Sequence, residues 1–339
     1  MGNKDISNQK QKNKELLETN SLFDNIKSKY ILKEVLGNVK KLILLKIIKN
    51  NKKLQKRLDI DKNDFKECSE KYTPIVIKII PTKNIFGKFI NISENDEKYF
   101  HVYFDDNKYE NSRNLNSDYE YGQEDEYDYE YEYKYRKINF LEENDKVKEI
   151  KIIIDYQIKS LKSLFYECKC IESVYFIKFL RKNIEDMSWM FYFCSNLRNI
   201  YFSNFNTENV IDMSHMFHGC PSLKSLNLTT FNTSKVTDMC CMFFLCESIK
   251  ELNLSNFNTE NVIDMRYMFK SCSSLKHLYI SNFNINNVEY MIGIFSNCSS
   301  LKKVRISNYD LINVYDEKSL LKNCPMELKM KFNDKRNEY

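Results

Sequence analysis

The sequence repeats itself every 26 residues between about residues 161 and 330. A column of phenylalanines runs from Phe165 to Phe295 and is closed by Leu321, and a column of methionines runs from Met187 to Met291. A fixed period of about 20 to 50 residues predicts an array in which each unit buries its apolar side against its neighbours. The clearest column is formed by seven cysteines: Cys168, Cys194, Cys220, Cys246, Cys272, Cys298 and Cys324.

Each repeat is predicted to contain an amphipathic helix. Apolar residues fall three and four positions apart from Met213 to Cys220, which is the spacing of one helix face. Asn206 or Thr207 is positioned to cap the start of that helix. An acidic residue recurs in its first turn, where the helix dipole favours negative charge. These acidic residues are Asp186, Asp212, Asp238 and Asp264.

A short strand follows the predicted helix in each repeat. After Pro221, the residues from Leu223 to Phe231 follow the L-x-x-L-x-L pattern of a strand with every second side chain inward. Neighbouring strands lie about 4.8 Å apart, whereas packed helices need about 8–10 Å. The stack of about seven repeats is therefore expected to curve, with parallel strands on the concave face and helices on the convex face.

These repeats resemble the BspA-like leucine-rich repeats, a family that also covers repeat domains of mycoplasma surface lipoproteins. The resemblance covers about half of the chain and implies a leucine-rich-repeat solenoid. A surface adhesin is one function that the bacterial relatives imply. The resemblance is carried by Phe231-Asn232-Thr233, Val236-Thr237-Asp238-Met239, Met242-Phe243, Cys246 and Leu252-Asn253-Leu254, with their equivalents one period away.

The predicted fold class is α/β: a leucine-rich-repeat solenoid preceded by a small mixed α/β N-terminal region. Five segments follow from the changes in composition. They are a disordered tail at 1–20, a helical and then β region at 21–104, an acidic tyrosine-rich low-complexity loop at 105–140, the repeats at 141–330 and a C-terminal tail at 331–339.

Residues 21–60 are predicted to form short helices and resemble an F-box. In that comparison Ile31–Leu36 is the first helix and Leu44–Gln55 lies in the second. The resemblance implies an adaptor that docks onto a ubiquitin-ligase scaffold through this region. Eight basic residues and no acid lie between Lys40 and Arg57. This stretch suits either an anionic surface or simple exposure to solvent.

Strands are predicted in the stretch 74–104 and again at Val147–Ile158, where a buried strand is expected to cap the first repeat. Between them, Asp118–Lys137 alternates tyrosines with acidic residues and lacks an aliphatic face. It is interpreted as a solvated loop, with a phosphotyrosine or basic-partner site as the alternative.

The expected compartment is the cytoplasm. No run of 18 apolar residues predicts a membrane span, and the polar stretch 1–20 lacks the apolar core of a secretory signal. Gly2 could accept a myristoyl group, but Ile6 occupies the position where that motif has Ser or Thr. The 11 cysteines are therefore expected to be buried free thiols rather than disulfides.

Catalytic and metal sites are not predicted. The six glycines form no phosphate-binding motif. His215, His218 and Cys220 could suggest a metal, but both histidines are assigned to a solvated helix face. The adjacent Cys240 and Cys241 have no nearby histidine or carboxylate base in the sequence and are rejected as a nucleophile. A net charge of +5 is modest for 339 residues, so nucleic acid is not an expected partner and no cofactor is implied.

The predicted function is a non-enzymatic protein-interaction scaffold that binds a protein partner on the concave face. On each strand the side chains between the inward ones must project from that face. A neighbouring column contains Ser173, Asn199, Ser225, Glu251, His277 and Lys303. The main predicted column contains aromatic residues and an arginine, types enriched at binding hot spots: Tyr175, Tyr201, Asn227, Asn253, Tyr279 and Arg305.

Overall fold

The computed structural model describes residues 51–58, 73–105, 139–143, 145–203, 205–306 and 320–328. The chain divides into two compact units, Met1–Thr73 and Pro74–Tyr339. In the first unit, helix α4 (Lys52–Leu58) is described, and the Leu54 N–H donates to Asn51 Oδ1 at 2.9 Å. Apart from residues 51–58, the F-box comparison lies outside the described residues. Gly2, Cys68 and the tyrosine-rich stretch 118–137 lie outside them as well.

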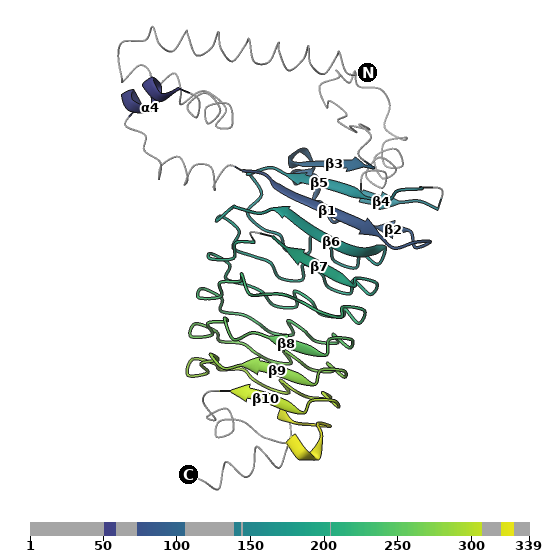
Figure 1. Cartoon of the computed structure of the whole chain (residues 1–339), viewed down its shortest axis with the longest axis vertical. Helices are drawn as coiled ribbons and strands as arrows, with labels where there is room; N and C mark the ends of the chain where they lie inside the picture. The colour runs from purple at the N-terminus through teal and green to yellow at the C-terminus, as the bar shows by residue number, and fades with distance from the viewer. Residues whose placement is uncertain are drawn as a thin grey trace, which may run out of the picture. The chain divides into compact units, whose positions relative to one another are not determined.

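The second unit begins with a five-stranded sheet in the order β3-β5-β1-β6-β7 (Figure 1). Strand β1 (Ile75–Pro81) pairs antiparallel with both β5 (Ile150–Ile154) and β6 (Ile171–Lys178). Strand β3 (Phe100–Phe104) pairs antiparallel with β5, and β7 (Asn199–Phe202) pairs parallel with β6. The strands predicted within 74–104 and 147–158 are thus confirmed.

The cap of the repeats is built from three strands rather than one. The isoleucines of β1 alternate, so that Ile75, Ile77 and Ile79 are fully buried while the residues between them are half-buried. Strand β1 is the neighbour of the first repeat strand, and β5 lies one strand further away. The segment expected to cap the repeats, Val147–Ile158, forms β5 and is therefore separated from the first repeat strand, β6, by β1. Strand β1 precedes the tyrosine-rich stretch in the sequence.

Three shorter elements lie near these strands in the sequence. Strands β2 (Gly87–Lys88) and β4 (Phe140–Leu141) form a separate antiparallel pair. A 3₁₀ helix, η1 (Glu94–Tyr99), leads directly into β3, and the Ser93 hydroxyl at its start donates to the Asp96 carboxylate at 2.7 Å.

The repeat strands continue in a second, three-stranded parallel sheet. It consists of β8 (Glu251–Asn253), β9 (His277–Ile280) and β10 (Lys303–Ile306). The strand predicted between Leu223 and Phe231 is wrong, because residues 223–228 are not assigned as a strand. The row of parallel strands is thus interrupted at residues 223–228. At this point the inward-facing residue of the repeat strand changes from Phe202 to the smaller Leu228.

The helix predicted in each repeat is also wrong, since residues 159–306 contain no helix in the part that the structure describes. Two residues four positions apart take left-handed backbone angles in each repeat, as at Trp189 (φ 60°) and Phe193 (φ 52°). A right-handed helix cannot pass through such residues. The N–H groups instead donate to the next repeat: those of Leu161, Ser163, Phe165 and Glu167 bond to the carbonyls of Asp186, Ser188, Met190 and Tyr192.

The residues assigned to helix capping stabilise turns and join repeats. The Asp212 carboxylate accepts the N–H of Ser214 at 2.8 Å, and Asp186, Asp238 and Asp264 make the same contact two residues on. Thr207 Oγ1 donates to the Asn232 carbonyl at 2.8 Å and accepts the Asn232 N–H at 2.7 Å. Both sides of a repeat are therefore hydrogen bonded to the next one. The curvature was expected because packed helices lie further apart than paired strands. Since the described repeats contain no helices, the predicted concave and convex faces lose their physical basis.

The core lies between the strands and the turns. The Phe176 ring on β6 meets the Phe191 ring on the turn side at 6.5 Å, edge to face. Successive phenylalanines of the turn side stack across repeats, with ring centroids 5.7 Å apart between Phe191 and Phe217. The methionine column is fully buried as well. Dispersion contacts between equivalent side chains thus connect neighbouring repeats directly.

The cysteine column belongs to this core. The Cys194 thiol donates to the Phe165 carbonyl of the preceding repeat at 2.9 Å, and the Cys220 thiol donates to the Phe191 carbonyl at 3.1 Å. The same contact recurs at Cys246, Cys272, Cys298 and Cys324. All ten cysteines in the described part of the chain are free, and nine of them are buried as expected, whereas Cys240 is half-buried. Each thiol fills a small apolar space and satisfies one carbonyl.

Candidate functional site

The predicted binding column lies on the outward side of the strands, which we call the strand face. Tyr175, Tyr201 and Tyr279 are half-buried or exposed, and Tyr201 reaches 47% exposure. Cross-strand pairing places Tyr175 opposite Tyr201, and Asn253 opposite Tyr279. The backbone of Arg305 pairs with that of Tyr279, but the arginine side chain lies outside the described atoms. Asn227 is exposed in the segment that separates the two sheets.

Tyr175 and Tyr201 form the most organised part of the strand face. Their rings stack with centroids 4.4 Å apart and planes within 9°. Lys78 Nζ on β1 lies 5.1 Å from the Tyr175 ring centroid, where the ring quadrupole attracts a cation. The same ammonium is 3.5 Å from the Glu149 carboxylate. These contacts restrict the side chains of two tyrosines and a lysine.

The row of tyrosines continues onto the cap, which sequence reasoning missed. Lys78 pairs with Tyr175 across β1 and β6, Lys151 pairs with Lys78, and Tyr103 pairs with Lys151. Lys151 Nζ lies 6.0 Å from the Tyr103 ring centroid. We call Tyr103, Lys151, Lys78, Tyr175 and Tyr201 the Tyr/Lys row. No motif signals it, because the sequence does not show which strand pairs with the first repeat.

The neighbouring predicted column is more varied. Ser173 is buried and accepts a hydrogen bond from Asn199 Nδ2 at 3.2 Å. Ser225 and Glu251 are exposed and His277 is half-buried, while the side chain of Lys303 is not described. In the main column, the amide oxygens of Asn227 and Asn253 accept the N–H groups two residues on, at 3.1 and 3.0 Å. The tyrosines differ from these serines and asparagines in having a large aromatic surface, and Tyr201 exposes 47% of its own.

A second group of functional side chains lies on the turn side, and it corrects the expectation for the histidines. His218 is only 7% exposed rather than on a solvated face, and His215 is half-buried. Their Nδ1 atoms are 2.9 Å apart. Cys220, the predicted companion, points into the core. The third ligand-type atom is Cys241 Sγ from the next repeat, and all three ligand atoms lie within 4.8 Å of one another.

Aromatic rings enclose the two histidines. The Trp189 ring stacks on His215 with centroids 3.9 Å apart and planes within 13°. Tyr192 packs on His218 at 4.7 Å and Phe244 at 4.6 Å. Burial, together with the adjacent His215, lowers the pKa of His218 to about 4. Its imidazole is therefore neutral at neutral pH, and one of its two ring nitrogens carries no proton and can accept a hydrogen bond or a metal ion.

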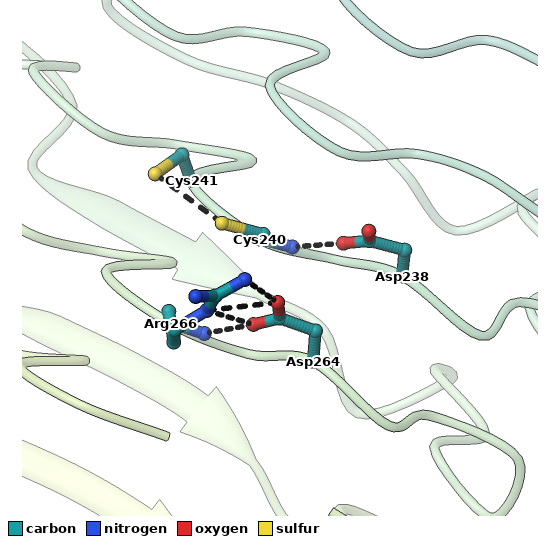
Figure 2. A network of polar contacts seen from close by, with 5 residues as sticks. All are labelled: Asp238, Cys240, Cys241, Asp264 and Arg266. Atoms are coloured by element: carbon teal, nitrogen blue, oxygen red, sulfur yellow. Dashed lines mark hydrogen bonds and ion pairs between the residues drawn. The ribbon is translucent and has the colours of Figure 1, made fainter. Parts of the chain in front are cut away.

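The adjacent thiols complete this cluster (Figure 2). The Cys240 thiol donates to Cys241 Sγ at 3.6 Å, which lowers the pKa of Cys241 and raises that of Cys240. The Cys240 N–H is held by the Asp238 carboxylate at 2.8 Å, and Arg266 Nε donates to Asp264 at 2.9 Å. The expectation that no histidine lies near the cysteine pair is wrong. We call His215, His218, Cys240 and Cys241 the His/Cys cluster.

Comparison with known proteins identifies the repeats. The model of the family described as "Mycoplasma protein of unknown function, DUF285" matches residues 159–251 and 244–335, just over half of the chain. A solved leucine-rich repeat protein from Bacteroides ovatus is 22% identical with a TM-score of 0.32. The match covers 45% of this chain and 35% of that protein, about a third of its length. No curated protein matches.

In the described part of the chain, no helix is both long and apolar enough to cross a membrane.

The family match lies on the residues that carry the cysteine, phenylalanine and methionine columns. The resemblance to BspA-like leucine-rich repeats is thereby confirmed. The chain belongs to the DUF285 family.

Proposed function

We propose that this protein is a non-enzymatic scaffold whose open stack of repeats binds a protein partner on the strand face. The observation that carries the proposal is the Tyr/Lys row: two stacked tyrosines, Tyr175 and Tyr201, extended in cross-strand register by Lys78, Lys151 and Tyr103. The leucine-rich-repeat family supports a protein-interaction or surface-repeat role. Stacked repeats of this kind commonly bind through extended surfaces.

The energetics of the row favour binding over a role in folding. Tyrosine offers a large contact area with few rotatable bonds, so little conformational entropy is lost when it is covered. The Tyr175–Tyr201 stack and the nearby Lys78 restrict the rings further. Preorganisation reduces the ordering cost of association. The core beneath needs none of these rings, because the inward positions are filled by Val174 and Phe176.

The double variant Tyr175→Ala/Tyr201→Ala tests the proposal. We expect it to weaken capture of the native partner at least about tenfold, ~1.4 kcal/mol. The free energy of unfolding should fall by the contribution of the ring stack, about 0.5–1.5 kcal/mol, and by that of the area that the two partly covered rings bury. The full chain is used as bait in a lysate of its source organism, and captured proteins are quantified by mass spectrometry.

Tyr290→Ala is the matched control. Tyr290 is also 47% exposed, but it lies in the turn-side ladder opposite Asp264, off the strand face. A partner that is lost from the double variant and kept by Tyr290→Ala supports the strand face as the interface. A partner that is kept by the double variant and lost from Tyr290→Ala contradicts it and transfers the interface to the turn side.

A further inference from the structure

The His/Cys cluster lies where the sequence departs from its own repeat. The position of His215 and Cys241 is occupied elsewhere by serine, tryptophan, tyrosine or glycine, and the position of His218 by tyrosine, phenylalanine, lysine or serine. The position of Cys240 carries lysine, serine, arginine or isoleucine in the other repeats. Four side chains that can bind a transition metal thus occur together in two adjacent repeats. The repeat scaffold does not require any of them.

The backbone brings these side chains together. His215 and Cys241 are equivalent residues of neighbouring repeats, and both take a left-handed conformation with φ 55°. The His215 N–H donates to the Cys240 carbonyl at 2.8 Å, which fixes one repeat on the next at this point. The cluster is therefore held by the hydrogen bonds between repeats and does not depend on a flexible loop.

The distances are close to those of a tetrahedral metal site. Zinc lies about 2.0–2.1 Å from imidazole nitrogen and about 2.3 Å from thiolate sulfur, so ligand atoms in a tetrahedron are about 3.3–3.6 Å apart. The two Nδ1 atoms of His215 and His218 are 2.9 Å apart, and Cys241 Sγ lies within 4.8 Å of a ring nitrogen of each histidine. Movements of a few tenths of an ångström at the nitrogens, and up to about an ångström at the sulfur, would complete the geometry.

The protonation states suit a metal ion. His218 is neutral at neutral pH because burial lowers its pKa, and the pKa of Cys241 is lowered by the hydrogen bond from Cys240. A neutral imidazole and a thiolate are the forms that bind metals. Lys270 and Arg266 also lower the pKa of Cys241, whereas Asp264 and burial raise it. His215 and Cys240 are both half-buried, so an ion can reach the cluster from solvent.

We propose that His215, His218 and Cys241 bind a divalent transition-metal ion of the zinc class, with water in the fourth position. The ion replaces the hydrogen bond between the two Nδ1 atoms: the donating ring loses its Nδ1 proton to solvent and takes one up at Nε2, so it stays neutral, and the thiol proton of Cys241 leaves to solvent. The ion then joins two neighbouring repeats through their side chains. Cys240 stabilises the thiolate by donating its S–H. This site lies on the turn side and is independent of the proposed partner surface.

Trp189 provides a built-in reporter for the test. It is the single tryptophan of the whole chain and stacks on His215 at 3.9 Å. Reduced, metal-free protein is titrated with Co²⁺, whose open d shell quenches fluorescence and gives visible absorption when it is bound to a thiolate. We expect one ion per chain, with quenching of Trp189 and absorption rising together. Added Zn²⁺, which has a filled d shell, should displace Co²⁺ and restore the emission.

Two variants remove one ligand each and use residues that equivalent repeat positions already carry. His218→Phe copies Phe244, and Cys241→Ser copies Ser163. Each should weaken Co²⁺ binding at least about tenfold, and Cys241→Ser should also abolish the thiolate absorption. His277→Ala on β9 is the control and should bind like the unmodified protein. Zn²⁺ should raise the melting temperature of the unmodified chain and of the control, but not that of Cys241→Ser.

Three results would overturn the proposal. The first is no uptake of Co²⁺ or Zn²⁺ by the reduced, folded chain. The second is uptake that His218→Phe and Cys241→Ser leave unchanged, which would place the ion elsewhere. The third is a reduced chain that takes up no ion but loses two thiols on mild oxidation, which would assign Cys240 and Cys241 to a disulfide instead.

Discussion

At the scale of single residues, burial decides what the polar side chains of this protein can do. His218 follows the inward-facing Phe217 in the sequence. If the two residues were on a helix, His218 would point away from the core and be exposed. In the turn that the chain actually forms, both residues are buried. The proximity of His218 to Cys241 could not be predicted from the sequence either. The two residues belong to different repeats, and Cys241 takes a left-handed backbone conformation.

The stability of the protein should depend on pH through His218. The folded pKa is about 4 and the ordinary value is 6.5, so between these values the unfolded chain binds a proton that the folded chain does not. The free energy of unfolding should therefore fall as the pH drops from 6.5 towards 4. One proton limits the slope to about 1.4 kcal/mol per pH unit.

Urea unfolding in metal-free buffer at a series of pH values measures this effect. His218→Phe keeps an aromatic ring and has no titrating group, so the difference between the unmodified chain and the variant isolates the histidine. Below pH 6.5 the free energy of unfolding of the unmodified chain should fall relative to that of the variant. Below pH 4 the difference between the two should no longer change. Parallel curves over this range would show that His218 is protonated in the folded protein.

At the scale of secondary structure, the strands of the cap were predicted correctly, but the repeats lack the strand expected at Leu223–Phe231 and form turns where helices were expected. Apolar runs bounded by turn residues predicted strands within 74–104 and at Val147–Ile158, and the structure places two of them at Ile75–Pro81 and Ile150–Ile154. Apolar residues three and four apart fit a helix, but they equally fit two consecutive turns with a left-handed residue in each. A signal was present: Gly219, Gly293 and Asn297 occupy the left-handed columns, and glycine and asparagine tolerate that conformation best.

Gly219→Ala tests the left-handed turns. Gly219 has φ 69°, and a Cβ atom placed there would lie 3.0 Å from the Phe193 ring. A left-handed non-glycine residue costs about 1–2 kcal/mol, and the contact adds to it, so we expect the free energy of unfolding to fall by about 1–3 kcal/mol. Ser271→Ala, at the equivalent position with φ 61°, already has a Cβ and should change it by under about 0.5 kcal/mol. Equal losses from both changes would contradict the left-handed assignment.

At the scale of the whole molecule, each repeat is stabilised by its two neighbours, so the ends of the stack need separate solutions. At the N-terminal end, β1 pairs with the outer edge of β6, and β5 and β3 continue the sheet. At the other end, the Asn297 N–H donates to the Lys322 carbonyl at 2.7 Å and the Cys324 thiol to the Phe295 carbonyl at 3.0 Å. Repeat periodicity predicts which columns of residues in such a stack are buried. It cannot predict the cap, whose sequence is not a repeat.

The N-terminal cap should keep the protein monomeric. An unpaired strand edge offers free N–H and C=O groups that pair with another chain. A chain that starts at residue 159 lacks β1, β3 and β5 and exposes the edge of β6, so we expect it to associate as its concentration rises. A chain that starts at residue 74 loses only the first compact unit and should stay monomeric. Sedimentation of both chains over a range of concentrations measures the difference. If both behave as monomers with the same unfolding transition, the cap strands do not protect the edge; if both associate, residues 1–73 contribute to that protection.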